Sequence, residues 1–102
     1  MTTQLLLTES PLADGAHRIA AAGEIDMTNA DTLDRALAAV SGRVVVDLTS
    51  VGYLDSAGLN VLFAHAERLE LIVPALLAPV LAISGLTDLA TVRSDGPPAP
   101  PD

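Results

Sequence analysis

Apolar and polar residues follow two periods along this chain, one typical of strands and one typical of helices. Between residues 17 and 25 alternate positions are apolar, which predicts a strand. From residue 28 to 40 apolar residues recur every three or four positions, which predicts a helix that Thr28 caps. The apolar positions of this helix are Ala30, Leu33, Leu37 and Val40.

Similar patterns predict the other elements. Strands are expected at residues 5–8, 43–48 and 70–73, a second helix at 56–68, and a short helix from Pro79 to about residue 85. Residues 86–92 fit no single element. Three successive valines at 44–46 are typical of a parallel strand buried on both faces, so Val44, Val46 and Leu48 are expected to face the core.

The order of these elements predicts an α/β fold. A strand–helix–strand crossover joins parallel strands in the right-handed sense, and the first two strands precede the first helix. We therefore expect one domain over residues 1–93, with a four- to five-stranded mixed sheet packed with three or more helices. Residues 94–102 contain four prolines and almost nothing to bury, which predicts a disordered tail.

Charge and composition exclude several classes of binding partner. The 102 residues carry a formal net charge of −8 and no lysine, which argues against nucleic acid and against anionic membrane surfaces. Without cysteine there is neither a disulfide nor a thiolate metal site. No apolar run is long enough to span a bilayer and the N-terminus lacks a signal-peptide pattern, so we expect a cytoplasmic protein with no membrane insertion.

Two acidic strand-to-helix junctions are the candidate sites. In open α/β sheets, ligands bind outside the carboxyl ends of the strands, and residues 23–26 and 54–58 lie at such ends. Ser56 begins the second predicted helix, where unpaired backbone N–H groups could stabilise a phosphate on its hydroxyl. A serine at this position can also be an ordinary helix cap.

The sequence gives little support for a catalytic site or a metal site. Asp26, Asp47 and Asp55 do not form a spaced ligand set, so no metal or cofactor site is predicted. His65 is expected on a solvated helix face. It lies about 13 Å along the helix from Ser56, too far for a hydrolase pair, so no catalytic residue is predicted.

The sequence segments around Ser56 resemble those of a known protein family. Val44-Val45-Val46-Asp47-Leu48 followed by Tyr53-Leu54-Asp55-Ser56-Ala57-Gly58-Leu59 resembles the strand, loop and helix start of STAS domains of the anti-sigma factor antagonist family. Gly23-Glu24-Ile25-Asp26 with Asn29-Ala30, and later Ser84-Gly85-Leu86, are similar to further segments of that family. The resemblance covers about residues 5 to 92.

This resemblance implies a bacterial partner-switching protein in transcription regulation. The unphosphorylated form would bind an anti-sigma factor with serine kinase activity and so release the sigma factor. Phosphorylation at Ser56 would reverse binding, and a phosphatase would restore it. The chain itself would not be an enzyme and would need no cofactor. The partner-binding residues that it implies are Asp26, Thr28, Asn29, Tyr53, Asp55, Ser56, Ala57, Gly58 and Asn60.

Some features leave a second interpretation open. Ala57 replaces a second hydroxyl residue of many family members, Asn60 stands where glycine is common, and residues 68–71 are too few for the usual loop after the second helix. The alternative function is a STAS-like scaffold or accessory subunit of a transport or lipid-trafficking complex, in which Ser56 only caps a helix. The oligomeric state is left open.

Overall fold

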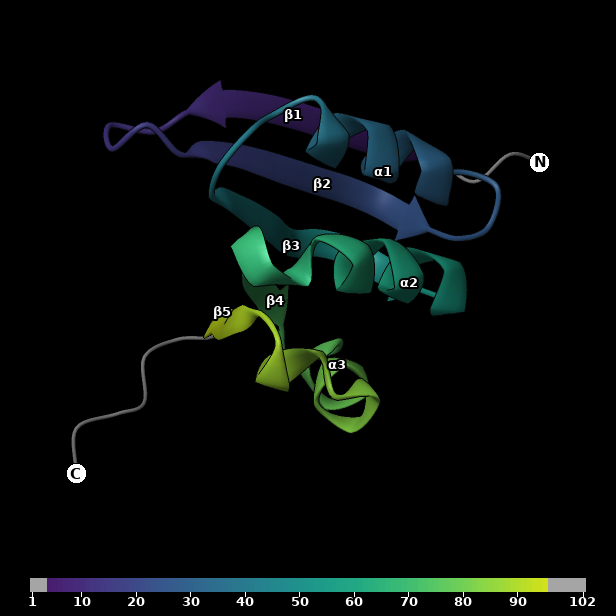
Figure 1. The fold of residues 1–102 in the computed structure, drawn as a ribbon. Helices are drawn as coiled ribbons and strands as arrows, with labels where there is room; N and C mark the ends of the chain where they lie inside the picture. Colours follow the sequence, from purple (N-terminus) through teal and green to yellow (C-terminus); the bar gives the residue numbers. More distant parts are fainter. Residues whose placement is uncertain (1–3, 96–102) are drawn as a thin grey trace.

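Ten elements follow one another along residues 4–95, the part of the chain that the computed structural model describes (Figure 1). The strands are β1 (Leu5–Pro11), β2 (His17–Ile25), β3 (Val44–Leu54), β4 (Leu69–Pro74) and β5 (Thr91–Asp95). The helices are α1 (Ala30–Ala38), α2 (Ser56–His65) and α3 (Ala78–Ser84), with short 3-10 turns η1 (Ala66–Arg68) and η2 (Leu86–Asp88).

The five strands form one mixed sheet in the order β1-β2-β3-β4-β5. β1 runs antiparallel to β2, and each later pair is parallel, which confirms the predicted fold class. Because every crossover adds its strand on the same side, right-handed connections place their helices on one face of the sheet. Figure 1 shows α1 and α2 together in front of the strands.

The core lies between this sheet face and the helices. Val44, Val46 and Leu48 of β3 are fully buried, as predicted from the valine run. They pack in one apolar cluster with side chains of the neighbouring strands and of all three helices. Other members of the cluster are Ile19, Ile25, Leu33, Leu37, Leu62, Leu71, Val73, Leu77, Leu81 and Leu86.

β3 is longer than predicted and reaches past β4. It pairs with β2 as far as Leu54, whereas its pairing with β4 ends at Asp47. The residues after Leu48 hid this extension, because their buried positions, Val51 and Leu54, are three apart and do not follow the period of two that marks a strand. The carboxyl end of β3 therefore lies beside the end of β2, at the edge of the sheet where both junctions begin.

The C-terminal third also differs from the prediction at its boundaries. η1 leads directly into β4, so no loop is needed after the second helix. Residues 86–92 form η2 and the start of β5, and β5 continues through Ser94 and Asp95, which the sequence pattern places in the tail. The rest of the predicted tail, residues 96–102, lies outside the described residues.

His65 is not the solvated residue that its position predicted. Its Nε2 lies 2.8 Å from Asp34 Oδ1 on α1, and its side chain is 15% exposed. Next to it, Arg68 donates to the carbonyl oxygens of Leu37, Val40 and Gly42 at the end of α1. These contacts join α1 to α2, and the partner carbonyls come from 26 to 31 residues away in the sequence.

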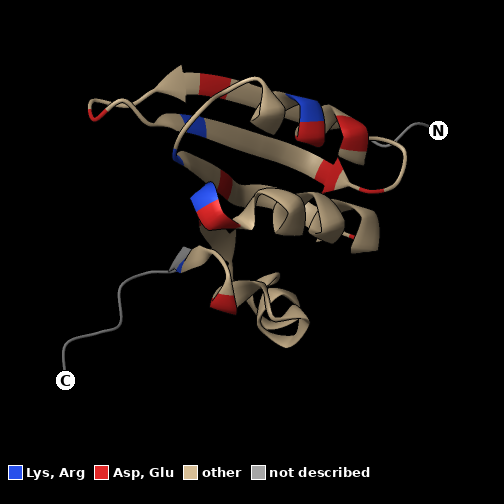
Figure 2. Ribbon diagram, viewed as in Figure 1, with Lys and Arg blue, Asp and Glu red and all other residues tan. Residues whose placement is uncertain are grey.

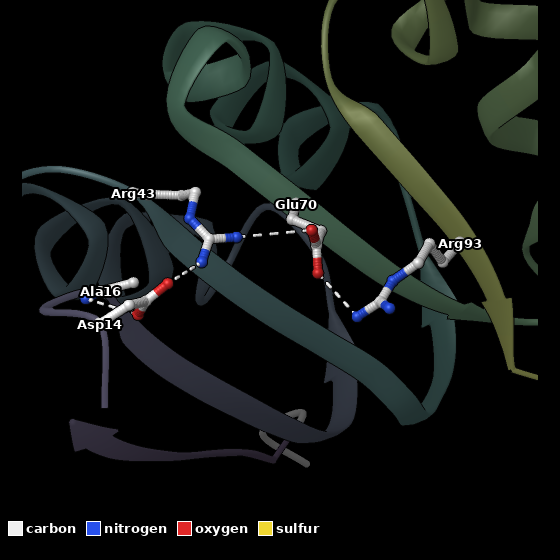
Figure 3. Close-up of polar contacts among 5 residues, drawn as sticks. All are labelled: Asp14, Ala16, Arg43, Glu70 and Arg93. Atoms are coloured by element: carbon white, nitrogen blue, oxygen red, sulfur yellow. Dashed lines mark hydrogen bonds and ion pairs between the residues drawn. The ribbon is translucent and has the colours of Figure 1, made fainter. Parts of the chain in front are cut away.

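An ion-pair chain crosses the opposite end of the sheet (Figure 3). Arg43 lies between Asp14 and Glu70, and Glu70 also pairs with Arg93 of β5 at 2.7 Å. The Ala16 amide, which donates to the Asp14 carboxylate at 3.2 Å, and then the Arg43 guanidinium lower the pKa of Asp14. These contacts link the β1–β2 turn to β3, β4 and β5 far from the acidic junctions.

Candidate functional site

The two acidic junctions meet at the carboxyl edge of β2 and β3. Ile25 is the register partner of Leu54, and Glu24 is that of Tyr53. Directly after them, the Asp55 amide donates to the Ile25 carbonyl at 3.1 Å. The segments 23–26 and 54–58, separated by almost thirty residues in the sequence, therefore form one site.

Asp55 is the N-cap of α2 and the main polar link within this site. Its Oδ1 accepts hydrogen bonds from the amides of Ala57 at 2.9 Å and Gly58 at 3.1 Å. Its Oδ2 accepts from the amide of Met27 in the β2–α1 loop at 3.1 Å. One carboxylate thus fixes the start of α2 and holds the neighbouring loop against it.

Ser56 is therefore the first residue of α2 and not its cap. Its side chain is exposed, and within residues 4–95 its hydroxyl makes no hydrogen bond. The capping interpretation of Ser56 is wrong, because Asp55 already occupies that position. We also expected free backbone amides at the start of α2 to donate hydrogen bonds to a phosphate on Ser56. The amides of Ala57 and Gly58 are not free for this, because they already donate to Asp55.

The β2–α1 loop is held by its own side chains. Asp26 Oδ1 accepts from both the amide and the hydroxyl of Thr28, at 2.8 and 2.5 Å. Asn29 Oδ1 accepts from the Asp26 amide at 2.9 Å, and its Nδ2 donates to the Glu24 carbonyl at 2.8 Å. Thr28 consequently does not cap α1, which begins at Ala30 with Asn29 in the N-cap position.

The predicted partner-binding residues divide into exposed and structural ones. Thr28, Tyr53, Ser56 and Asn60 are exposed, whereas Asp26, Asp55 and Ala57 are half-buried. Asn29 and Gly58 are buried. Asn29 holds the β2–α1 loop by hydrogen bonds, and Gly58 packs against the core residues Ile25 and Leu54. All lie within or next to the two junctions.

Met27 was missed by the sequence analysis. Its side chain is 81% exposed, although it lies between residues that anchor the loop. The sequence signal was a large apolar residue flanked by Asp26 and Thr28 in a segment that must form a polar loop. Exposed methionines are adaptable contacts for a protein partner, so Met27 joins the candidate surface.

The charged residues of the segments 23–26 and 54–58 are all acidic. Figure 2 shows acidic segments where β2 ends and where α1 and α2 begin, while the basic segments lie away from this edge. Glu24, Asp26 and Asp55 contribute these charges. Three of the arginines instead lie at the opposite end: Arg18 near the start of β2, Arg43 before β3 and Arg68 before β4.

Asp47 lies inside β3, away from the site. Burial raises its pKa, but hydrogen bonds from the Thr49 hydroxyl and amide and from the Arg18 guanidinium together outweigh burial, so the pKa is lowered. Among residues 4–95, no group of three or more His, Cys, Asp or Glu side chains is arranged to hold a metal ion. The same range contains no helix long and apolar enough to cross a membrane.

Comparison with solved structures shows proteins that share this fold. An anti-sigma factor antagonist from Mycobacterium paratuberculosis superposes with a TM-score of 0.79 at 24% identity, covering 88% of this chain and 86% of that one. The anti-sigma factor antagonist SpoIIAA in its unphosphorylated form gives 0.69 at 16% identity, covering 88% and 90%. An antisigma-factor antagonist STAS domain from Rhodobacter sphaeroides gives 0.52 at 17% identity, covering 68% and 84%.

Comparison by sequence gives the family. No curated protein matches this chain. The family described as "Mlab, STAS domain" matches residues 10–93, which include both junctions and every helix. The chain belongs to the STAS domain family.

Proposed function

We propose that this protein is an anti-sigma factor antagonist that acts as a phosphorylation-controlled binding module. In its unmodified form it docks on an anti-sigma factor with serine kinase activity in the bacterial cytoplasm and releases the sigma factor. The kinase, which brings its own ATP and Mg²⁺, then phosphorylates Ser56 and is released. A phosphatase restores the binding form, and the chain catalyses none of these steps.

The observation that carries the proposal is the state of the Ser56 hydroxyl. It is exposed and makes no hydrogen bond within residues 4–95, so a kinase can reach it without first breaking a contact. It also lies at the edge where the two junctions meet, three residues after the exposed Tyr53. The fold shared with three anti-sigma factor antagonists supports the same function.

A phosphate on Ser56 would change this edge electrostatically. It adds about −1.5 to −2 charges at pH 7 next to the carboxylate of Asp55. Because two of the nearby amides already donate to Asp55, the new dianion has few donors there and remains on the docking surface. A partner packed on that surface would have to desolvate the phosphate, and we expect its affinity to fall at least tenfold.

The test compares defined forms of the protein against a purified anti-sigma factor kinase encoded in the same genome. Intact-mass analysis after incubation with ATP should show one phosphate on wild type and none on Ser56→Ala. Ser50→Ala is the matched control, because Ser50 is an exposed serine of β3 six residues earlier. Titration of phosphorylated and unphosphorylated protein then measures the loss of affinity. Stoichiometric phosphorylation of Ser56→Ala, or equal affinity of the two forms, contradicts the proposal.

An accessory-subunit function is the second candidate. The observation that favours it is the description of the matching family, which names Mlab beside the STAS domain. In that case the same edge would hold a constant partner in a transport or lipid-trafficking complex. Ser56→Ala and Ser56→Glu would then bind that partner with similar affinity, which separates the two functions.

A further inference from the structure

Exposed apolar side chains lie at all three strand-to-helix junctions. Met27 follows β2, Tyr53 lies at the end of β3, and Leu76 follows β4, with exposures of 81%, 50% and 67%. Parallel strands point the same way, so all three junctions lie toward the carboxyl end of the sheet, although β4 stops short of the edge where β2 and β3 end. Each junction thus presents one large apolar group to solvent.

The apolar surface continues along the outer side of α3. Leu77 and Leu81 face the core, whereas Leu76, Val80 and Ile83 are 67%, 41% and 88% exposed. Val80 and Ile83, three residues apart, lie on one face of α3, and Leu76 lies in the turn just before its N-cap. We call these three side chains the α3 outer face. A helix that is apolar on all sides is normally buried on all sides, and here the protein covers only one side.

The charge pattern separates this surface from the rest of the molecule. Residues 71–87 contain no charged side chain, in a chain whose net charge is −8. The adjoining junctions carry only acidic groups, Glu24 and Asp26 among them, with no arginine between residues 19 and 34 or 44 and 67. A protein that covers both regions must therefore be apolar opposite α3 and basic opposite the junctions.

The size of the α3 outer face argues against a second copy of this chain. A standard interface buries about 800 Å² per partner. Three aliphatic side chains, each smaller than an aromatic residue that buries 150–250 Å², stay well below about 800 Å². A second copy would also bring further acidic groups to an acidic edge. The α3 outer face gains enough area only when the same partner also covers the junctions.

We propose that the α3 outer face and the junction residues Met27 and Tyr53 form one continuous docking surface for a single protein partner. The partner carries apolar side chains against α3 and basic side chains against Glu24 and Asp26. This inference rests on the proposed function, because it extends the surface around Ser56 to a second element.

Site-specific photo-crosslinking in the native cell tests the inference. A benzoylphenylalanine is placed at Met27, at Ile83 or, as the matched control, at Leu89, which is 55% exposed but lies just before β5 at the amino end of the parallel strands. Mass spectrometry should identify the same protein at Met27 and Ile83 and not at Leu89. Ile83→Glu should then weaken binding of that purified protein at least tenfold, Leu89→Glu less than threefold, and rising salt should weaken it further.

The outcomes distinguish this surface from the phosphorylation switch. An adduct at Met27 without the same adduct at Ile83, an equal adduct at Leu89, or no adduct at any position overturns the single surface. Unchanged affinity of Ile83→Glu overturns it as well. If both adducts form but persist in the Ser56→Glu background, the docking surface stands and the phosphorylation switch fails.

Discussion

Gly58 has no room for a side chain, although it lies in the first turn of a helix. A Cβ at this position would lie 2.5 Å from Leu54 Cδ1 and 2.7 Å from Ile25 Cγ2. Both distances are far below ordinary van der Waals contact. Ile25 is fully buried and Leu54 is 8% exposed, so neither side chain can turn into solvent. Gly58→Ala must therefore push α2 away from the ends of β2 and β3.

Two opposing effects set the size of this change. Alanine is favoured over glycine within a helix by up to about 1 kcal/mol. Overpacking a closed core position costs about 1–3 kcal/mol. We expect a net loss of about 1–2 kcal/mol, which corresponds to a fall in Tm of roughly 5–15 °C for a domain of this size. Because Ile25 and Leu54 immediately precede Asp26 and Asp55, the displacement should also disturb the edge where the two junctions meet.

Urea unfolding followed by circular dichroism measures the loss directly. The control is Gly52→Ala on β3, where an added Cβ meets nothing within 4 Å and the backbone φ is not in the left-handed region. That variant should stay within about 0.5 kcal/mol of wild type. If Gly58→Ala is as stable as wild type, the close packing of α2 on Ile25 and Leu54 does not limit this position.

Three further substitutions test the polar contacts. Asp55→Ala should cost about 0.5–2 kcal/mol by urea unfolding and speed hydrogen exchange of the Met27 amide, because the α2 cap and the loop contact are both lost. Arg68→Ala should cost about 1–3 kcal/mol, with Arg68→Lys only partly restoring it, because an ammonium lacks the fork of donors that reaches three carbonyls. The lowered pKa of Asp47 means that its ionised form stabilises the fold above pH ~4, and that this stability is lost as pH falls through the folded pKa. Urea midpoints between pH 3 and 7 should therefore fall less steeply on the acid side in Asp47→Asn than in wild type.

Local patterns predicted much of the fold. The valines at 44–46 predicted a buried parallel strand, and their neighbours in the structure leave Val44 and Val46 without exposure. The predicted second helix begins at Ser56, as observed. Both signals depend on side-chain size and spacing alone, which a sequence displays directly. The first junction was found for the same reason, since it follows a strand that was correctly identified. The second follows β3, whose last six residues the sequence analysis did not predict.

Contacts between distant segments could not be predicted in this way. His65 bonds to Asp34 on another helix, and Asp55 holds Met27 across the gap between two junctions. Threonine is a residue type that often caps helices. Here the hydroxyl of Thr28 donates to Asp26 instead, and α1 begins after Asn29. In each case the choice depends on a partner whose position only the folded chain defines.

The strand order has a consequence for how this protein folds during synthesis. Every strand pairs with the strand just before or after it in the chain, so no pairing waits for a distant segment. Each β-α unit can therefore add to a sheet edge that already exists. Ser56, Asp55 and the β2–α1 loop all precede Leu69. The edge that carries Ser56 can thus assemble on the ribosome before α3, which is the last of the three helices to emerge.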